Sequence, residues 1–328
     1  MKGYYRTLKL FLIRMKEGIK LSRAFTYSLL VLVMFIWGLN VVAIKFLVNE
    51  VPPITMQGMR IFVSGLFAIT VLYFLKDLRK LTKKEWFYAG LAALFGQLGH
   101  HTFLALGLVE TTAANAGLIL GMIPLATVIL TMIFLRDRPT ILRLIGIFLG
   151  FTGVAIIVLQ NGEGIGVVSR GDLFIFLSMS TQALSFILIK KITATLSARQ
   201  LTAVMLLIGS VFITSISFVF EPNGVSAMTG KSATIWSVFF ASAIIATGLG
   251  HILYNAAIQQ IGASETAIFN NLVPFFSLVG AFLFLGEAIR FTQVLGFILI
   301  VNGVLLGTGY LEMKMIARIQ KRKLQKTG

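Results

Sequence analysis

The chain has 328 residues, of which 57% are hydrophobic and only 12% are charged, and its mean hydropathy is +0.91. Soluble domains carry about 25% charged residues, so this composition excludes an ordinary soluble protein. The formal net charge is +17, but the Lys and Arg lie in short segments between long apolar blocks, which argues against nucleic-acid binding. With no Cys and three His, the sequence excludes disulfides, thiolate chemistry and a multi-histidine metal site, and we expect no cofactor.

The first segment, residues 1–24, is basic and carries apolar residues at helical spacing. This pattern is typical of an amphipathic helix on the inner leaflet of a membrane, and a basic tail that only sets orientation is the alternative. The apolar block that starts near Phe25 lacks a small-residue cleavage site. We therefore expect a retained helix and not a cleaved signal peptide.

Ten apolar blocks follow in chain order, most of them roughly twenty residues long, which is the length that a helix needs to cross the hydrocarbon core. Charged turns and Pro- or Gly-containing turns separate them. The sequence predicts an all-α integral membrane protein with ten transmembrane helices at residues 25–48, 56–75, 86–108, 113–135, 141–159, 172–189, 200–220, 233–258, 264–285 and 291–310.

The distribution of Lys and Arg supports this count and predicts an orientation. If the chain begins on the cytoplasmic side, 24 of its 29 Lys and Arg fall in inner segments and three in outer loops. Positive charge holds loops on the cytoplasmic side, and a missed span would reverse every later loop. We therefore expect a multi-pass protein of the cell (inner) membrane with both termini in the cytoplasm.

An internal repeat organises the chain. At an offset of 150 residues His101 corresponds to His251 and Pro124 to Pro274, and the first helices of the two halves match at an offset of 145. Because each half has five helices, an odd number, the second copy enters the membrane from the opposite side, as in many secondary transporters. The sequence predicts inverted five-helix repeats at 25–159 and 172–310, a linker at 160–171 and a basic cytoplasmic tail at 311–328.

Several motifs resemble the EamA-type permeases of the drug/metabolite transporter superfamily. They are FIWGLNVVAIK at 35–45, Met59-Arg60, the Pro-centred segments GMIPLATVILTMIFLRDRP and NNLVPFFSLVGAFLFLGEAI, and the glycine-rich segments LIGIFLGFTGVAIIV and VLGFILIVNGVLLG. The resemblance covers 25–310 and implies export, sometimes import, of amino acids or other small metabolites. The chain departs from the family pattern at Arg136-Asp137, where Gly-Glu is usual, and at Gln182, where an aromatic residue is common.

These features together predict a secondary transporter that exports amino acids or related compounds across a bacterial inner membrane by alternating access. A flippase for a lipid-linked substrate is the alternative within the same architecture. A membrane-embedded enzyme is a more distant alternative, because the spans hold neither clustered His nor paired carboxylates. The expected partners are the small-molecule substrate and membrane lipids, and the glycine-rich helices suggest a homodimer.

Polar residues inside a span are costly and indicate interhelical hydrogen bonds or a substrate path. Two pairs share a helix face: Trp37 with Asn40, and Gln97 with His101. We expect them to face a polar cavity together with their counterparts from the second half, and the predicted substrate path comprises Trp37, Asn40, Gln97, His101, Gln182, His251 and Asn255. If transport is coupled to protons, His101 and His251 are the predicted carriers, whereas His100 is expected to face another helix.

Other residues have structural roles in this interpretation. Pro124 and Pro274 interrupt their helices and are predicted hinges, and Asn270 and Asn271 could satisfy the backbone groups that Pro274 frees. Lys45 and Arg60 are expected to reach the membrane interface, Arg60 by snorkelling or by pairing with Glu50, with contact to an anionic substrate as the alternative. Asn115 and Glu265 are expected to cap helices. Close helix packing is assigned to Gly146, Gly150, Gly153, Gly303 and Gly307.

Overall fold

The computed structural model of the chain describes residues 23–135, 140–159, 169–193, 195–261, 266, 268–307 and 309. Within these residues every regular element is a helix and no strand occurs, which confirms the predicted all-α fold. The predicted N-terminal amphipathic helix, most of the linker and the C-terminal tail lie outside the described residues, as do Asp137 and Glu265.

Each predicted span overlaps a helix or a run of consecutive helical segments. The first half contains α2 (Arg23–Glu50), α3 (Pro53–Phe74), α4 (Lys83–Ala93) continued by η1 (Leu94–Gly99) and α5 (His100–Glu110), α6 (Ala113–Leu120) continued by α7 (Ile123–Leu135), and α8 (Ile141–Val158). The second half contains α9 (Arg170–Ile192), α10 (Ala198–Phe220), the short α11 (Gly224–Ala227), α12 (Ala233–Phe240) continued by η2 (Ala241–Leu249) and α13 (Gly250–Ile261), η3 (Ile268–Asn271) with α15 (Leu272–Leu285), and α16 (Phe291–Gly307).

Helices are the natural elements here because a bilayer offers no water to satisfy an exposed backbone. Seven of the helical stretches in the described chain are long and apolar enough to cross a membrane. The predicted fifth, ninth and tenth spans correspond to shorter apolar helices, Ile141–Ile157, Phe269–Leu285 and Phe291–Gly307. The count of ten crossings therefore stays a prediction.

Two contacts between the halves agree with the predicted topology, in which successive loops lie on alternating sides of the membrane. On the side predicted to be external, the Glu221 carboxylate accepts from the backbone N–H groups of Ile54 and Thr55 at 3.0 and 2.7 Å, and so caps the N-terminus of α3. On the predicted cytoplasmic side, Arg199 lies 2.8 Å from Asp77. Both contacts join the two halves, and each joins loops predicted to lie on the same side. Which side is cytoplasmic remains a prediction.

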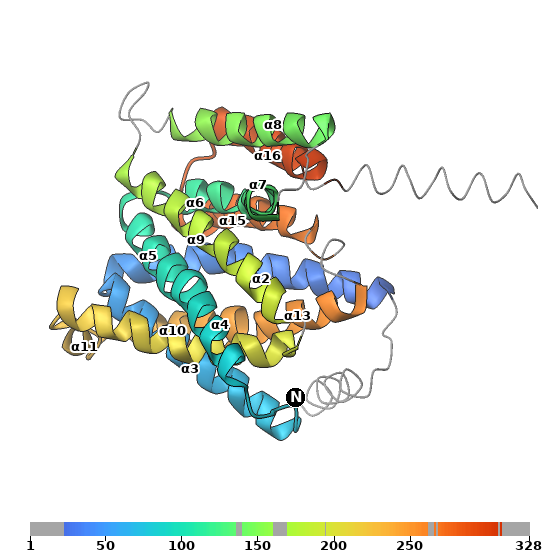
Figure 1. Cartoon of the computed structure of the whole chain (residues 1–328). Helices are drawn as coiled ribbons and strands as arrows, with labels where there is room; N and C mark the ends of the chain where they lie inside the picture. Colours follow the sequence, from blue (N-terminus) through green and yellow to red (C-terminus); the bar gives the residue numbers. More distant parts are fainter. Residues whose placement is uncertain are drawn as a thin grey trace, which may run out of the picture.

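The glycine-rich helices α8 and α16 lie against each other at one edge of the bundle (Figure 1). A Cβ atom on Gly303 would lie 2.6 Å from the backbone nitrogen of Gly150, and one on Gly153 would lie 2.8 Å from the carbonyl oxygen of Gly296. The glycines thus allow backbone-to-backbone packing within one chain. The predicted homodimer is untested, and these glycine faces are already occupied.

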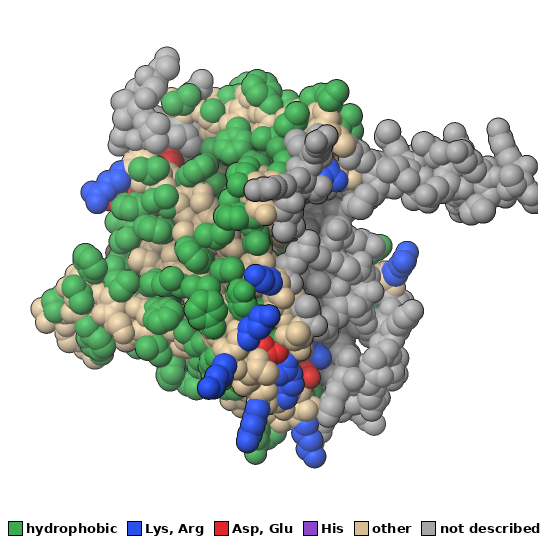
Figure 2. Space-filling view, in the orientation of Figure 1, with side chains coloured by type: hydrophobic (Ala, Val, Ile, Leu, Met, Phe, Trp, Pro, Cys, Tyr) green, Lys and Arg blue, Asp and Glu red, His purple; other side chains and the backbone are tan. Residues whose placement is uncertain are grey.

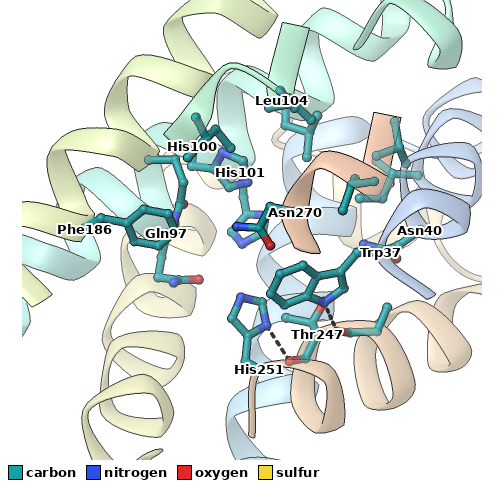
Figure 3. Close-up of a pocket in the computed structure, with 18 of the residues that line it drawn as sticks. Trp37, Asn40, Gln97, His100, His101, Leu104, Phe186, Thr247, His251 and Asn270 are labelled. Atoms are coloured by element: carbon teal, nitrogen blue, oxygen red, sulfur yellow. Dashed lines mark hydrogen bonds between the residues drawn. The ribbon is translucent and has the colours of Figure 1, made fainter. Parts of the chain in front are cut away.

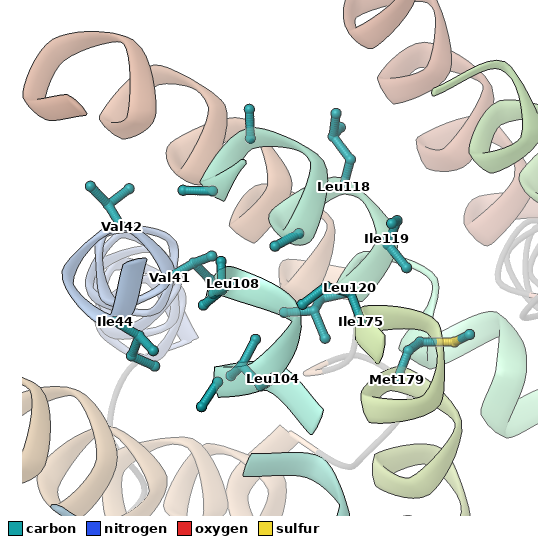
Figure 4. Close-up of a cluster of buried hydrophobic side chains, with 14 of the residues drawn as sticks. Val41, Val42, Ile44, Leu104, Leu108, Leu118, Ile119, Leu120, Ile175 and Met179 are labelled. Carbon is teal, nitrogen blue, oxygen red and sulfur yellow. The ribbon is translucent and has the colours of Figure 1, made fainter. Parts of the chain in front are cut away.

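Apolar side chains cover most of the described surface in the view of Figure 2, and basic side chains gather where α3 and α4 meet. The basic group there includes Lys76, Arg79, Lys80, Lys83 and Lys84, all of them exposed. A buried apolar cluster from α2, α5, α6 and α9 joins the two halves (Figure 4). Val41, Ile44, Leu104 and Leu120 of this cluster also line the central cavity.

Candidate functional site

A cavity of about 150 Å³ lies between the two halves of the bundle. Its lining comes from the first, third and fourth helical spans of each repeat: α2, η1–α5 and α6–α7 from the first half, and α9, η2–α13 and η3–α15 from the second. Among the described residues, the second and fifth spans contribute none of its lining. The site is therefore built in the same way by both repeats.

The structure brings six of the seven predicted path residues to this cavity: Trp37, Asn40, Gln97, His101, Gln182 and His251. The side chain of Asn255 lies outside the described part of the chain. Figure 3 shows Trp37, His101 and His251 converging on the middle of the cavity. Their role in transport stays a prediction.

Sequence reasoning missed three lining residues, His100, Phe186 and Asn270, whereas Thr247, the counterpart of Gln97 at the offset of 150 residues, lines the cavity with His251 as its helix face predicts. His100 does face another helix as expected, because its Nδ1 lies 2.8 Å from the Ser178 hydroxyl of α9. Asn270 donates to the Tyr254 hydroxyl at 3.0 Å, and no contact to the backbone near Pro274 is seen for its side chain. The proximity of Asn270 to Pro274 in sequence therefore suggested the wrong partner.

Two π-helical segments position the cavity histidines. η1 ends directly before His100 and η2 ends two residues before His251, so the third span of each repeat carries this distortion at an equivalent place. A π-segment shifts the hydrogen-bonding pattern of the backbone and is frequent at functional sites. In η2 the carbonyl of Ala243 accepts from the Ser64 hydroxyl at 2.8 Å, and that of Ala246 accepts from the Trp37 indole at 2.9 Å.

Trp37 is held by the second half, although it belongs to the first. Besides its bond to Ala246, its ring lies 5.0 Å from the rings of both His251 and Tyr254, measured between centroids. At this separation aromatic rings attract one another. The indole is thus a fixed part of the cavity wall.

Arg60 is fully buried, so the expectation that it reaches the membrane interface or pairs with Glu50 is wrong. Its guanidinium donates to Gln57 at 2.7 Å, to Thr247 at 2.7 Å and to Ser242 at 3.3 Å. It also lies 3.1 Å from Nδ1 of His101. Thr247 and His101 both line the cavity, so the guanidinium sits directly behind its wall. The sequence did carry a signal for this site, because Arg60 lies seven residues after the start of α3 at Pro53, inside an apolar span, with Gln57 one turn earlier.

These contacts assign different hydrogen positions to the two repeat-related histidines. A guanidinium can only donate, so Nδ1 of His101 accepts from Arg60, and the ring carries its hydrogen on Nε2. His251 Nδ1 lies 2.8 Å from the carbonyl of Thr247, which can only accept. Its ring therefore carries its hydrogen on Nδ1 and has a free lone pair on Nε2. One cavity histidine is a donor and the other an acceptor.

The predicted hinge residues lie at real helix breaks that touch each other. α6 ends at Leu120 and α7 begins at Ile123, directly before Pro124, while η3 ends at Asn271 and α15 begins at Leu272, two residues before Pro274. A Cβ atom on Gly121 would lie 2.5 Å from Cγ of Pro274. The fourth spans of the two repeats therefore meet at their breaks, beside the cavity. A hinge function for these residues stays a prediction.

Two further expectations are corrected. Thr112, not Asn115, caps α6, because its hydroxyl accepts from the backbone of Asn115 at 3.1 Å; the buried Asn115 side chain instead accepts from Gln293 at 2.8 Å. Lys45 donates to the carbonyl of Leu108 at 2.7 Å near the end of α5 and does not extend freely to the interface. Among the described residues, no group of three or more His, Asp or Glu could hold a metal ion.

The chain is similar in sequence to a family of transporters and to individual proteins that are named as transporters. The EamA-like transporter family matches residues 24–159 and again residues 169–308. The uncharacterized transporter YyaM of Bacillus subtilis is 30% identical over 274 residues, covering 82% of this chain and 88% of its own. A second Bacillus subtilis protein, the uncharacterized transporter YvbV, is 28% identical, covering 88% and 92%.

A solved crystal structure has the same fold, with a TM-score of 0.64 and 18% sequence identity, covering 88% of this chain and 97% of the solved one. The double family match accounts for the two halves of the bundle and for the cavity between them. This chain belongs to the EamA-like transporter family, within the drug/metabolite transporter superfamily, and is a multi-pass membrane transporter.

Proposed function

We propose that this protein is a permease that exports an amino acid or a related small polar metabolite across a bacterial inner membrane by alternating access of its two repeats. The observation that carries the proposal is the position of the cavity, which is lined by the same three spans of each repeat. In transporters with inverted repeats, the substrate site lies at the interface between the repeats.

The chemistry of the lining suits a small molecule with both hydrogen-bond donors and acceptors. The polar lining residues are His, Asn, Gln, Thr and Trp, and no Asp, Glu, Lys or Arg is among the lining residues described. The amide oxygens of Gln97 and Asn270 are buried without a hydrogen-bond partner among the described residues. Such groups favour a substrate that brings its own donors, as an ammonium group does.

The helix distortions support movement around this cavity. The breaks near Pro124 and Pro274 meet each other, and η1 and η2 lie in the two third spans that carry the histidines. Backbone departures from the α-helix inside a membrane are tolerated where they line a cavity or are buried in protein. Small rotations at these four places would open the cavity to one side and close it to the other.

The test is mass spectrometry of the medium from cells that overproduce the native protein or the Trp37→Ala/His101→Ala double variant at equal membrane level. Trp86→Ala is the matched control, because Trp86 is 51% exposed and lies outside the cavity. We expect amino acids or related metabolites to accumulate with the native protein and with Trp86→Ala, and not with the double variant.

Equal accumulation with the double variant would support export and contradict the assigned site. No accumulation with the native protein would contradict export. A flipping assay with a fluorescent lipid in proteoliposomes would then distinguish the flippase alternative from uptake of a small molecule.

A further inference from the structure

Arg60 is a cation buried in the bundle, and no counter-ion for it is found in the described part of the chain. None of the carboxylates in the described part of the chain lies within 4.0 Å of its guanidinium, and its four partners are the neutral groups of Gln57, Ser242, Thr247 and His101. A buried charge is costly unless it is paired, and ionisable residues inside a membrane usually mark a substrate or ion pathway. The hydrogen bonds give each of the three guanidinium nitrogens a partner, but no described residue compensates the charge.

Two hydrogen-bonded chains carry the influence of this charge to the cavity. In the first, the guanidinium donates to Nδ1 of His101, which leaves Nε2–H as the free donor of the ring. In the second, the guanidinium donates to the Ser242 hydroxyl, and that hydroxyl donates to the amide oxygen of Asn40. The amide N–H groups of Asn40 are then its free donors. His101 and Asn40 both line the cavity.

The arrangement therefore gives one part of the cavity wall a positive potential and orients its N–H groups. Each donor is polarised by the cation behind it, because hydrogen bonds in a chain strengthen one another in a low-dielectric environment. No acidic residue among the described lining competes for these donors. A negatively charged group entering the cavity would meet two N–H donors and a fixed cation one side chain further away.

We propose that the transported substrate supplies the missing negative charge: it carries a carboxylate that binds to Asn40 and His101 in front of Arg60. Arg60 acts as a positioning residue, because it orients these two donors and compensates the charge of the carboxylate without lining the cavity itself. Two neutral donor side chains backed by a single cation suit a carboxylate better than a phosphate dianion. The inference rests on the proposed function and specifies its substrate class.

The test introduces an internal counter-ion beside Arg60. Thr247 lies 2.7 Å from the guanidinium, so Thr247→Asp places a carboxylate against it, and Thr247→Asn is the matched uncharged control of nearly the same shape. Export is measured by mass spectrometry of the medium, normalised to the amount of each variant in the membrane. Because Thr247 lines the cavity, the two variants share the same change in side-chain shape and differ only in charge, and we expect Thr247→Asp to export at least about tenfold less than Thr247→Asn.

The metabolites exported by the native protein provide a second reading that needs no variant. We expect every enriched metabolite to carry a carboxylate. Enrichment of compounds that lack an anionic group, or equal export by the Asp and Asn variants, would overturn the inference and leave the transporter intact. No enrichment by the native protein would contradict the proposed function itself, and the inference would fall with it.

Discussion

The third span of the first repeat and the third span of the second repeat have the same backbone design and different chemistry. Each contains a π-helical segment followed closely by a histidine that lines the cavity. In the first repeat His101 accepts a hydrogen bond from Arg60, whereas in the second His251 donates one to the carbonyl of Thr247. Duplication thus preserved the distortion of the helix while the hydrogen-bonding role of the histidine changed.

The difference comes from the helices that pack against these segments. α3 of the first repeat packs against η2 of the second, and α10 packs against η1 in the reciprocal way. On the face of α10 that packs against η1, the buried residue beside Gly96 is Met205, which carries no charge. One buried cation on one side of the pseudo-symmetric pair is therefore enough to make the two halves of the cavity unequal.

The largest expected effect on export comes from removing the buried charge that makes the two halves of the cavity unequal. Arg60→Met gives α3 an uncharged residue at its contact with η2, as Met205 is at the contact of α10 with η1, and we expect export to fall more than about tenfold, because the donors at the cavity lose the charge behind them. Arg60→Met also leaves buried acceptors such as Nδ1 of His101 without their donor, so export is normalised to the amount of each variant in the membrane. The control is Met205→Leu, a volume-conserving change that costs less than about 1.5 kcal/mol. Similar export by both variants would show that the cation has no special role.

A second comparison separates the two histidines as proton carriers. His251 has a free lone pair on Nε2, whereas a second proton on His101 would displace the hydrogen bond from Arg60 and place two cations side by side. We expect the pH dependence of transport between about pH 5 and 8 to disappear in His251→Gln and to persist, at a lower rate, in His101→Gln. Transport in proteoliposomes across this range measures it, and a flat profile only in His101→Gln would reverse the assignment.

The smallest expected effect concerns the first spans, where Trp37 corresponds to Gln182. Trp37→Phe leaves the carbonyl of Ala246 without its indole donor and should lower the free energy of unfolding by about 1 kcal/mol. Gln182 makes no hydrogen bond to another described residue, so Gln182→Met should change the free energy of unfolding by less than about 0.5 kcal/mol. Denaturation of the purified variants in detergent compares them, and equal losses would contradict the asymmetry.

Much of the architecture was predictable because its signals are local. Apolar length identified the helical spans, and the offset of 150 residues related His101 to His251 and Pro124 to Pro274. Residues three or four positions apart share a helix face, which is why Trp37 with Asn40 and Gln97 with His101 were correctly expected to reach a common cavity.

The errors concern partners that lie far away in sequence. Arg60 was expected at the interface, and its burial depends on Ser242 and Thr247, more than 180 residues further along the chain. Asn115 was expected to cap its helix, and its partner is Gln293 on α16. Helical periodicity gives the face on which a residue lies but does not give the element that packs against that face.

The sequence by itself determined the membrane-spanning class, the helices, the two repeats and most of the polar residues that line the cavity, because each follows from composition, spacing or self-similarity within the chain. Only the tertiary structure decided where the charge of Arg60 resides, which hydrogen each cavity histidine carries and that the π-segments and helix breaks of both halves surround one site. Those features depend on which helices of opposite repeats come into contact, and a hydrogen bond between distant residues acquires its direction only when both partners are in place.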